Sequence, residues 1–219
     1  MPTRLAHRVL RLVALLSTVI CGAALLPSSA WAEVITTNLA DPADGGSFVN
    51  STFPQRAQAF STTATGTQIS AVTLDVSSST LAQPFSIKVY STGTSGLPDT
   101  SVATIFSGTG GDVIFGASPF TVSGLNLNLA PSTQYFMVFQ HGGSFSGQWN
   151  YNLETSGSGG GFLVDNSLSQ TTVDNWQGIS NAQPYRMEVV AVPEPPAIVM
   201  AGIGIASAIW SLQRRRKSA

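Results

Sequence analysis

The chain has 219 residues, of which only 10% are charged, and a formal net charge of −1. That value hides an acidic middle, because between residues 33 and 192 ten acidic residues face only Arg56, Lys88 and Arg186, which leaves about −7. Nucleic-acid binding depends on Lys and Arg contacts to phosphates, so this composition excludes nucleic acid as a partner.

Residues 1–32 have the three parts of a secretory signal. A basic start and an apolar centre, "LVALLSTVICGAALL", precede an A-x-A cleavage site formed by Ala30 and Ala32. The mature chain is therefore predicted to begin at Glu33. The small residues at the cleavage site argue against the alternative, an uncleaved anchor helix. The basic residues of the start are Arg4, Arg8 and Arg11.

The single cysteine, Cys21, lies inside this signal. A lipoprotein signal needs a small residue before the cysteine, and Ile20 stands there, so a lipid anchor is excluded. The exported part then has no cysteine, and it has neither a disulfide nor a cysteine metal site. It must hold its fold by packing and hydrogen bonds.

Short stretches with a period of two follow the signal, and this period predicts half-buried strands. One further stretch, "TQYFMVFQ" (133–140), is apolar on both faces, as expected of a central strand. Turn signals rich in Gly, Ser and Asp separate them. We therefore expect residues 33–191 to form an all-β domain, an antiparallel β-sandwich with jelly-roll-like connections. The alternating stretches are 72–76, 85–90, 125–129, 149–153 and 185–192.

Residues 192–219 form a separate tail. Residues 197–212 carry no charge and, as a helix, are about 24 Å long, slightly short of a hydrocarbon core of about 30 Å. Extension to residue 213 and the basic run at 214–217 favour one transmembrane helix, 197–213, over a buried core helix, because basic residues mark the cytoplasmic side. The basic residues are Arg214, Arg215, Arg216 and Lys217.

The tail resembles the PEP-CTERM sorting signal of Gram-negative bacteria. The match consists of Pro193, Glu194 and Pro195, the apolar helix and the basic end. The resemblance implies that exosortase, a membrane-embedded transpeptidase-like enzyme, cuts near the motif. The exported domain would then pass from its membrane anchor to the cell surface or the extracellular matrix.

The exported domain resembles the choice-of-anchor domains of the R type, which carry such tails. The matching stretches are 57–63, 85–108 and 124–139, about half of the domain. This resemblance implies a β-sandwich without a defined activity.

Residues with catalytic chemistry are few. His141, in "QHGGS", is the one histidine of the exported part, and no G-x-S-x-G motif supplies a nucleophile. The acidic residues are scattered, so they indicate no glycosidase pair. We therefore assign no catalytic residue and no metal ligand. Asp41 and Asp44 are candidates for Ca²⁺, but they lack the alternating ligand pattern, so a turn is favoured.

Aromatic residues are the remaining candidates for binding, because their rings can stack on sugars. Trp149 and Tyr151 alternate with Asn and are predicted to be core residues, whereas Trp176, in "VDNWQG", is predicted to be exposed and to contact sugar. The sequence thus predicts a non-enzymatic, exosortase-sorted surface or matrix protein associated with exopolysaccharide. The alternatives are a secreted hydrolase and an uncleaved, membrane-tethered spacer.

Overall fold

A computed structural model describes residues 32–40, 42–113, 119–153, 162–172, 175–178 and 184–192. Residues Ala32–Pro193 form one compact unit. The predicted signal before residue 32 and the predicted tail from residue 193 lie outside the described residues. The strands are β1 (Glu33–Thr37), β2 (Gly45–Val49), β3 (Gln55–Ser61), β4 (Gln68–Leu74), β5 (Val76–Ser78), β6 (Pro84–Thr92), β7 (Pro98–Thr109), β8 (Phe120–Asn128), β9 (Gln134–His141), β10 (Gly147–Tyr151), β11 (Phe162–Thr172), β12 (Asn175–Gly178) and β13 (Met187–Val192).

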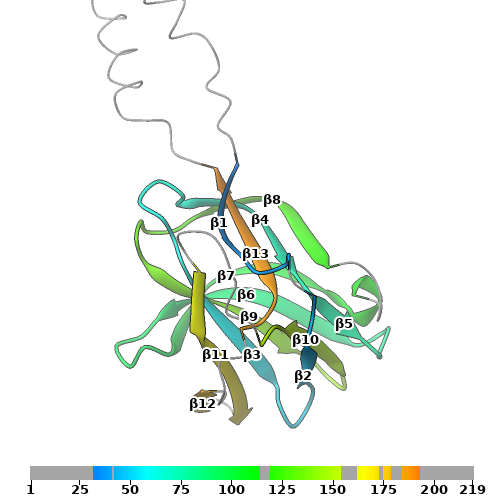
Figure 1. The fold of residues 1–219 in the computed structure, drawn as a ribbon. Coiled ribbons are helices and arrows are strands. Elements are labelled where there is room, and N and C mark those ends of the chain that lie inside the picture. Colours follow the sequence, from blue (N-terminus) through cyan, green and yellow to red (C-terminus); the bar gives the residue numbers. More distant parts are fainter. Residues whose placement is uncertain are drawn as a thin grey trace, which may run out of the picture. The chain divides into compact units, whose positions relative to one another are not determined.

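These strands form three sheets (Figure 1). A six-stranded sheet has the order β12-β11-β3-β9-β6-β7, a four-stranded sheet the order β1-β13-β4-β8, and a three-stranded sheet the order β2-β10-β5. Every strand pair within the described part is antiparallel. One 3₁₀ turn, Gly110–Asp112, follows β7. The predicted all-β, antiparallel, sandwich-like fold is thereby confirmed.

The main core lies where the sheets face one another. Side chains that alternate along β6 and β9 meet those of β4 and β13, and apolar burial is the principal stabilising term. The alternation expected in β6 is confirmed, because Phe85, Ile87 and Val89 are at most 3% exposed. Five phenylalanines form one cluster of ring contacts, with Phe85 at 5.3 Å from Phe139 and 5.5 Å from Phe145 between ring centroids.

Strand β9 is central, as its sequence predicts. It lies between β3 and β6, and five consecutive residues, 135–139, are buried. Phe136 and Val138 face away from the main core and form a second cluster with two alanines of β3. Trp176, Tyr90 and Leu97 pack against this second cluster.

Two predicted strands differ in extent from the structure. The stretch 72–76 changes sheet at Asp75, so Leu74 ends β4 and Val76 begins β5. The stretch 149–153 ends as a strand at Tyr151, which forms an isolated antiparallel bridge with Tyr185 through the Asn152 N–H and the Pro184 carbonyl, 3.1 Å apart. Leu153 is consequently 53% exposed instead of lying on the buried face.

Candidate functional site

The two ends of the described domain lie side by side. Glu33 pairs with Ala191, and the antiparallel register continues from Val34 to Thr37 along β13. Ala32, the second small residue of the predicted cleavage site, is exposed. The motif residues 193–195, the helix 197–213, the basic run 214–217 and Ala30 lie outside the described residues. Within the described ranges, no helix is long and apolar enough to cross a bilayer.

The aromatic residues divide between core and surface. Trp149 and Tyr185 are fully buried and stack with ring centroids 4.8 Å apart at 17°, and Tyr151 is partly buried against the main core. These three therefore serve packing, as predicted for Trp149 and Tyr151. Trp176 stands on β12 and is partly buried against the second cluster, so it is less exposed than its polar surroundings suggested.

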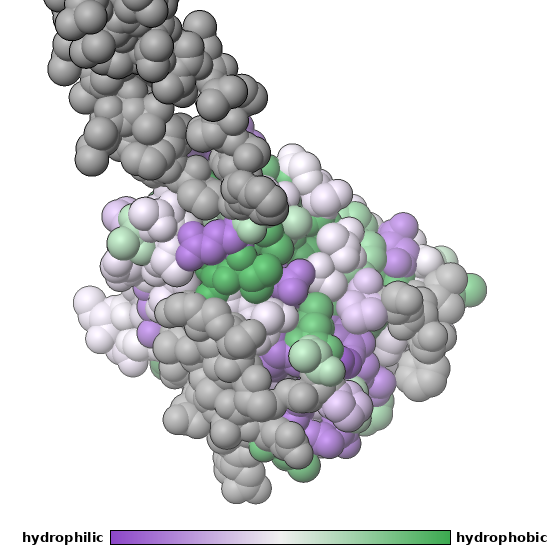
Figure 2. Space-filling view, turned by 45° about the horizontal axis from the view of Figure 1, so that its top comes forward, coloured by the Kyte–Doolittle hydropathy of each residue, from purple (hydrophilic) through white to green (hydrophobic). Residues whose placement is uncertain are grey.

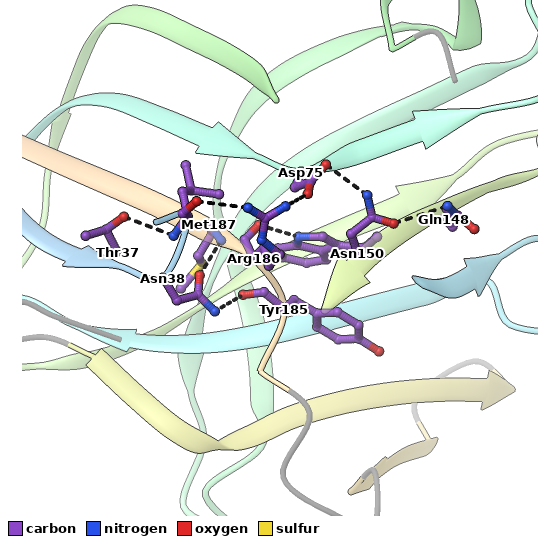
Figure 3. A network of polar contacts seen from close by, with 10 residues as sticks. Thr37, Asn38, Asp75, Gln148, Asn150, Tyr185, Arg186 and Met187 are labelled. Carbon is purple, nitrogen blue, oxygen red and sulfur yellow. Dashed lines mark hydrogen bonds and ion pairs between the residues drawn. The ribbon is translucent and has the colours of Figure 1, made fainter. Parts of the chain in front are cut away.

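A polar network joins the three-stranded sheet to the start of β13 (Figure 3). The Arg186 guanidinium pairs with the Asp75 carboxylate, and the two side chains are 11% and 12% exposed. Arg186 Nη2 also donates to the Leu39 carbonyl at 2.9 Å. Its own carbonyl accepts from the indole N–H of Trp149 at 2.9 Å. A buried charge is tolerated only with partners of this kind.

The network continues outward along β10. Asn150 Nδ2 donates to Asp75 Oδ1 at 2.9 Å, and Gln148 Nε2 donates to Asn150 Oδ1 at 3.1 Å. A carboxylate only accepts, so Asp75 fixes which end of the Asn150 amide faces it and, through Asn150, the orientation of Gln148. Gly46 leaves the space for this arrangement, because a Cβ there would lie 2.7 Å from Gln148 Cδ.

A second branch fixes the chain before β13. Asn38 Nδ2 donates to the Tyr185 carbonyl at 3.2 Å, and Asn38 Oδ1 accepts from the Met187 N–H at 2.8 Å. Gln58 Oε1 accepts from the Tyr185 N–H at 2.9 Å. Burial raises the pKa of the Tyr185 phenol, and the nearby Arg56 guanidinium opposes that rise. Burial likewise lowers the pKa of Arg56.

A shallow groove of about 80 Å³ lies on the outward face of the three-stranded sheet. Phe48 pairs with Gln148, which pairs with Ser77, so the three side chains form a row across β2, β10 and β5. Five large apolar side chains of the described surface are exposed, and Phe48, at 58%, is the aromatic one among them. The groove is lined by Phe48, Ser77, Ser79, Ser146, Gly147 and Gln148.

The face of the molecule drawn in Figure 2 is mixed in character. In Figure 2, hydrophobic residues in green stand among hydrophilic residues in purple over the face that is drawn. An aromatic ring beside hydroxyl and amide groups combines an apolar contact with directional hydrogen bonds, as ligand sites commonly do.

Sequence reasoning missed Phe48 and Gln148, although a signal for both was present. Gln148 and Asn150 alternate with the core residues Trp149 and Tyr151, which places them on the opposite, outward face of one strand. Phe48 is the one aromatic residue in the short polar strand "GGSFV". The register that joins them across β2 and β10 could not be read from the sequence.

Of the other predicted candidates, His141 and Asp44 do not line this groove. His141 ends β9 and is partly buried, and its Nδ1 has no hydrogen-bond partner within the described part. Asp44 is exposed, and its Oδ2 accepts from the Leu153 N–H at 2.7 Å. Asp41 lies outside the described residues. Over the ranges that are described, no three His, Cys, Asp or Glu side chains gather as a metal site.

The fold places this chain among all-β, sandwich-like proteins. No family model and no curated protein matches it. Two solved structures of Cwp84, a surface layer associated protein of Clostridium difficile, share the fold at 12% identity. One, a variant after propeptide cleavage, has a TM-score of 0.53 over 73% of this chain and 40% of that chain. The other, with cysteine protease and lectin-like domains, has a TM-score of 0.52 over 77% and 37%.

Proposed function

We propose that this chain is an exported, non-enzymatic protein of the cell surface or extracellular matrix, which exosortase sorts through Pro193, Glu194 and Pro195. The signal 1–32 directs export, and the helix 197–213 holds the domain in the membrane until the tail is cut. The domain is a jelly-roll-like sandwich that associates with exopolysaccharide. It needs neither cofactor nor catalytic residue for this role.

The pairing of β1 with β13 is the observation that carries this proposal. Strand β1 begins at Glu33, directly after the predicted cleavage site, and β13 ends at Val192, directly before Pro193. Cutting at either place therefore removes no strand from the four-stranded sheet. A domain whose first strand begins and whose last strand ends beside the two predicted processing sites is suited to release from a signal and from an anchor.

Association with polysaccharide rests on the surface chemistry. The exported part is rich in Ser, Thr and Gly and poor in cations, so neutral hydroxyl and amide groups dominate its polar surface. The surface layer association and the lectin-like domains named for Cwp84 are properties of that protein. On a shared fold they make carbohydrate binding a function to test. Trp176, partly buried on β12, remains the sugar contact that we propose from the sequence.

The sorting step is tested by intact mass spectrometry of the protein from cells with and without exosortase. We expect a chain that starts at Glu33 and ends near the motif when the enzyme is present. Without the enzyme, we expect a chain that extends to Ala219. A Glu194→Ala variant should retain its tail, whereas Glu188→Ala, a matched change in β13, should be cut normally. A full-length tail in both strains would contradict sorting and favour the membrane-tethered spacer.

The hydrolase alternative is tested on the same protein. A panel of glycosides and esters should show no turnover above the background of a blank preparation. Turnover that disappears in a His141→Ala variant would overturn the non-enzymatic assignment.

A further inference from the structure

The outward row of the three-stranded sheet has the chemistry of a small binding site. Phe48 offers one exposed ring face beside polar groups on two neighbouring strands. The carbonyl of Phe48 accepts from Arg56 Nε at 2.9 Å, which holds the backbone of β2 at this residue. The ring is therefore presented on a fixed strand instead of a loop.

The polar groups of the groove are oriented before any ligand arrives. Gln148 directs its Nε2 to Asn150, so its Oε1 is the atom that can accept from a ligand. The Ser79 hydroxyl donates to the Ser146 carbonyl at 3.2 Å, which leaves its oxygen lone pairs as acceptors. Both groups are fixed by the protein itself, and such preorganisation favours binding.

Ser77 supplies an independent observation. It lines the groove, is 6% exposed, and its hydroxyl has no hydrogen-bond partner in the part of the chain that the structure describes. Buried hydroxyls are normally paired, and an unpaired one at a site edge calls for a partner from outside the fold. A ligand hydroxyl becomes such a partner once a neighbouring side chain moves aside, because the Ser77 hydroxyl oxygen itself is closed to solvent.

Charge decides which ligand fits. The groove is lined by one aromatic residue, three serines, a glycine and a glutamine, and none of these is charged. Of the charged residues nearby, Asp75 and Arg186 neutralise each other, and Arg56 is only 7% exposed and donates its Nε–H to the Phe48 carbonyl. An acidic or basic ligand would find no opposite charge here, whereas a neutral hydroxylated ring matches both the aromatic face and the acceptors.

We propose that this groove binds a neutral sugar residue of a polysaccharide, which stacks on Phe48 and donates hydroxyls to Gln148, with Ser77 beneath it. This inference rests on the proposed polysaccharide association and names its site and ligand class. The glycan assay and the mass assay are separate readouts. Failure of either one therefore leaves the other interpretable.

The test uses the purified full chain in a detergent whose headgroup is not a sugar. Binding is measured by surface plasmon resonance on dextran, a soluble β-1,3-glucan and a galactomannan, with alginate as the acidic comparison. We expect binding to at least one neutral polysaccharide, and weaker binding to alginate. Phe48→Ala should weaken binding to the neutral polysaccharide about tenfold, an effect typical of a residue at the centre of a binding site.

Four further variants separate stacking from other causes. Phe48→Tyr keeps an aromatic face and should bind neutral polysaccharide as tightly as the parent chain does. Phe48→Leu should lose as much affinity as Phe48→Ala. Val102→Ala changes an exposed apolar residue of β7, outside the groove, and should bind unchanged. Ser77→Ala should weaken binding while its melting temperature stays equal or rises, because it removes an unpaired buried hydroxyl.

Several results would overturn the proposal. These are no binding to any of the three neutral polysaccharides, tighter binding to alginate, or equal binding by the parent chain, Phe48→Ala and Phe48→Leu. A Phe48→Ala change that turns a dimer into a monomer with unaltered glycan binding would assign this face to contact between copies.

Discussion

Replacement of Arg186 by Met should destabilise the domain strongly. The change leaves the Asp75 carboxylate, 12% exposed, without its ion-pair partner, and it removes the donor to the Leu39 carbonyl. Removing one member of a buried pair typically costs about 3–5 kcal/mol, because the remaining charge stays desolvated. For a domain of this size, that loss lowers the melting temperature by about 6–20 °C.

A second substitution, Asp75→Asn, tests whether the desolvated Asp75 charge causes the loss of stability. In the Arg186→Met background it removes the isolated charge and keeps an oxygen that can accept from Asn150. We therefore expect it to restore about 2–3 kcal/mol, although alone it should destabilise by leaving Arg186 unpaired. Urea unfolding followed by tryptophan fluorescence gives the three free energies. If the losses of the two single variants simply add in the double variant, the desolvated charge is not the cause.

Three other perturbations test separate parts of the fold. In Gly110→Ala, the new Cβ would meet the Thr80 carbonyl, so we expect a loss of about 1–3 kcal/mol in urea unfolding. The pKa of Tyr185 is raised by burial, so its stabilising contribution is present below the unfolded value of about 10 and is lost as pH rises through the folded pKa. Tyr185→Phe should therefore show a smaller fall in melting temperature between pH 8 and 11. Trp176→Ala should lower the melting temperature more than Trp176→Phe does, and equal effects would exclude packing on the second cluster.

Local pattern predicted the strands whose burial is one-sided. Phe85, Ile87 and Val89 alternate with polar residues, and all three are buried, because the period of two follows directly from strand geometry. Strand β7 has a mostly polar sequence and lies at a sheet edge, where little burial is required. No alternation of apolar and polar residues therefore predicts this strand.

The pairing between distant strands could not be predicted from the sequence. Phe48, Ser77 and Gln148 come from three segments, and their row exists only through the register of β2, β10 and β5. The Asp75–Arg186 pair joins residues 111 positions apart for the same reason. In the sequence, each of these residues is one polar or apolar residue among many, and Asp75 interrupts what reads as one continuous strand.

A buried ion pair needs a reason other than stability, since well-packed apolar residues often serve as well. Here the pair lies at the start of β13, six residues or about 20 Å along the strand from Val192, where the tail begins. In Figure 1, β2 and β10 likewise lie away from the end where β1 starts and β13 stops. The pair therefore stands next to the groove and away from the predicted processing sites.

This position assigns the pair a role in orienting Gln148. Combined with Arg186→Met, Asp75→Leu removes the acceptor of Asn150, whereas Asp75→Asn keeps it. We expect both double variants to fold, as judged by one cooperative urea transition. The variant with Leu should bind neutral polysaccharide several-fold more weakly than the variant with Asn, since Asn150 no longer orients the Gln148 amide. Equal affinities in the two would show that the network stabilises the domain without setting the geometry of the groove.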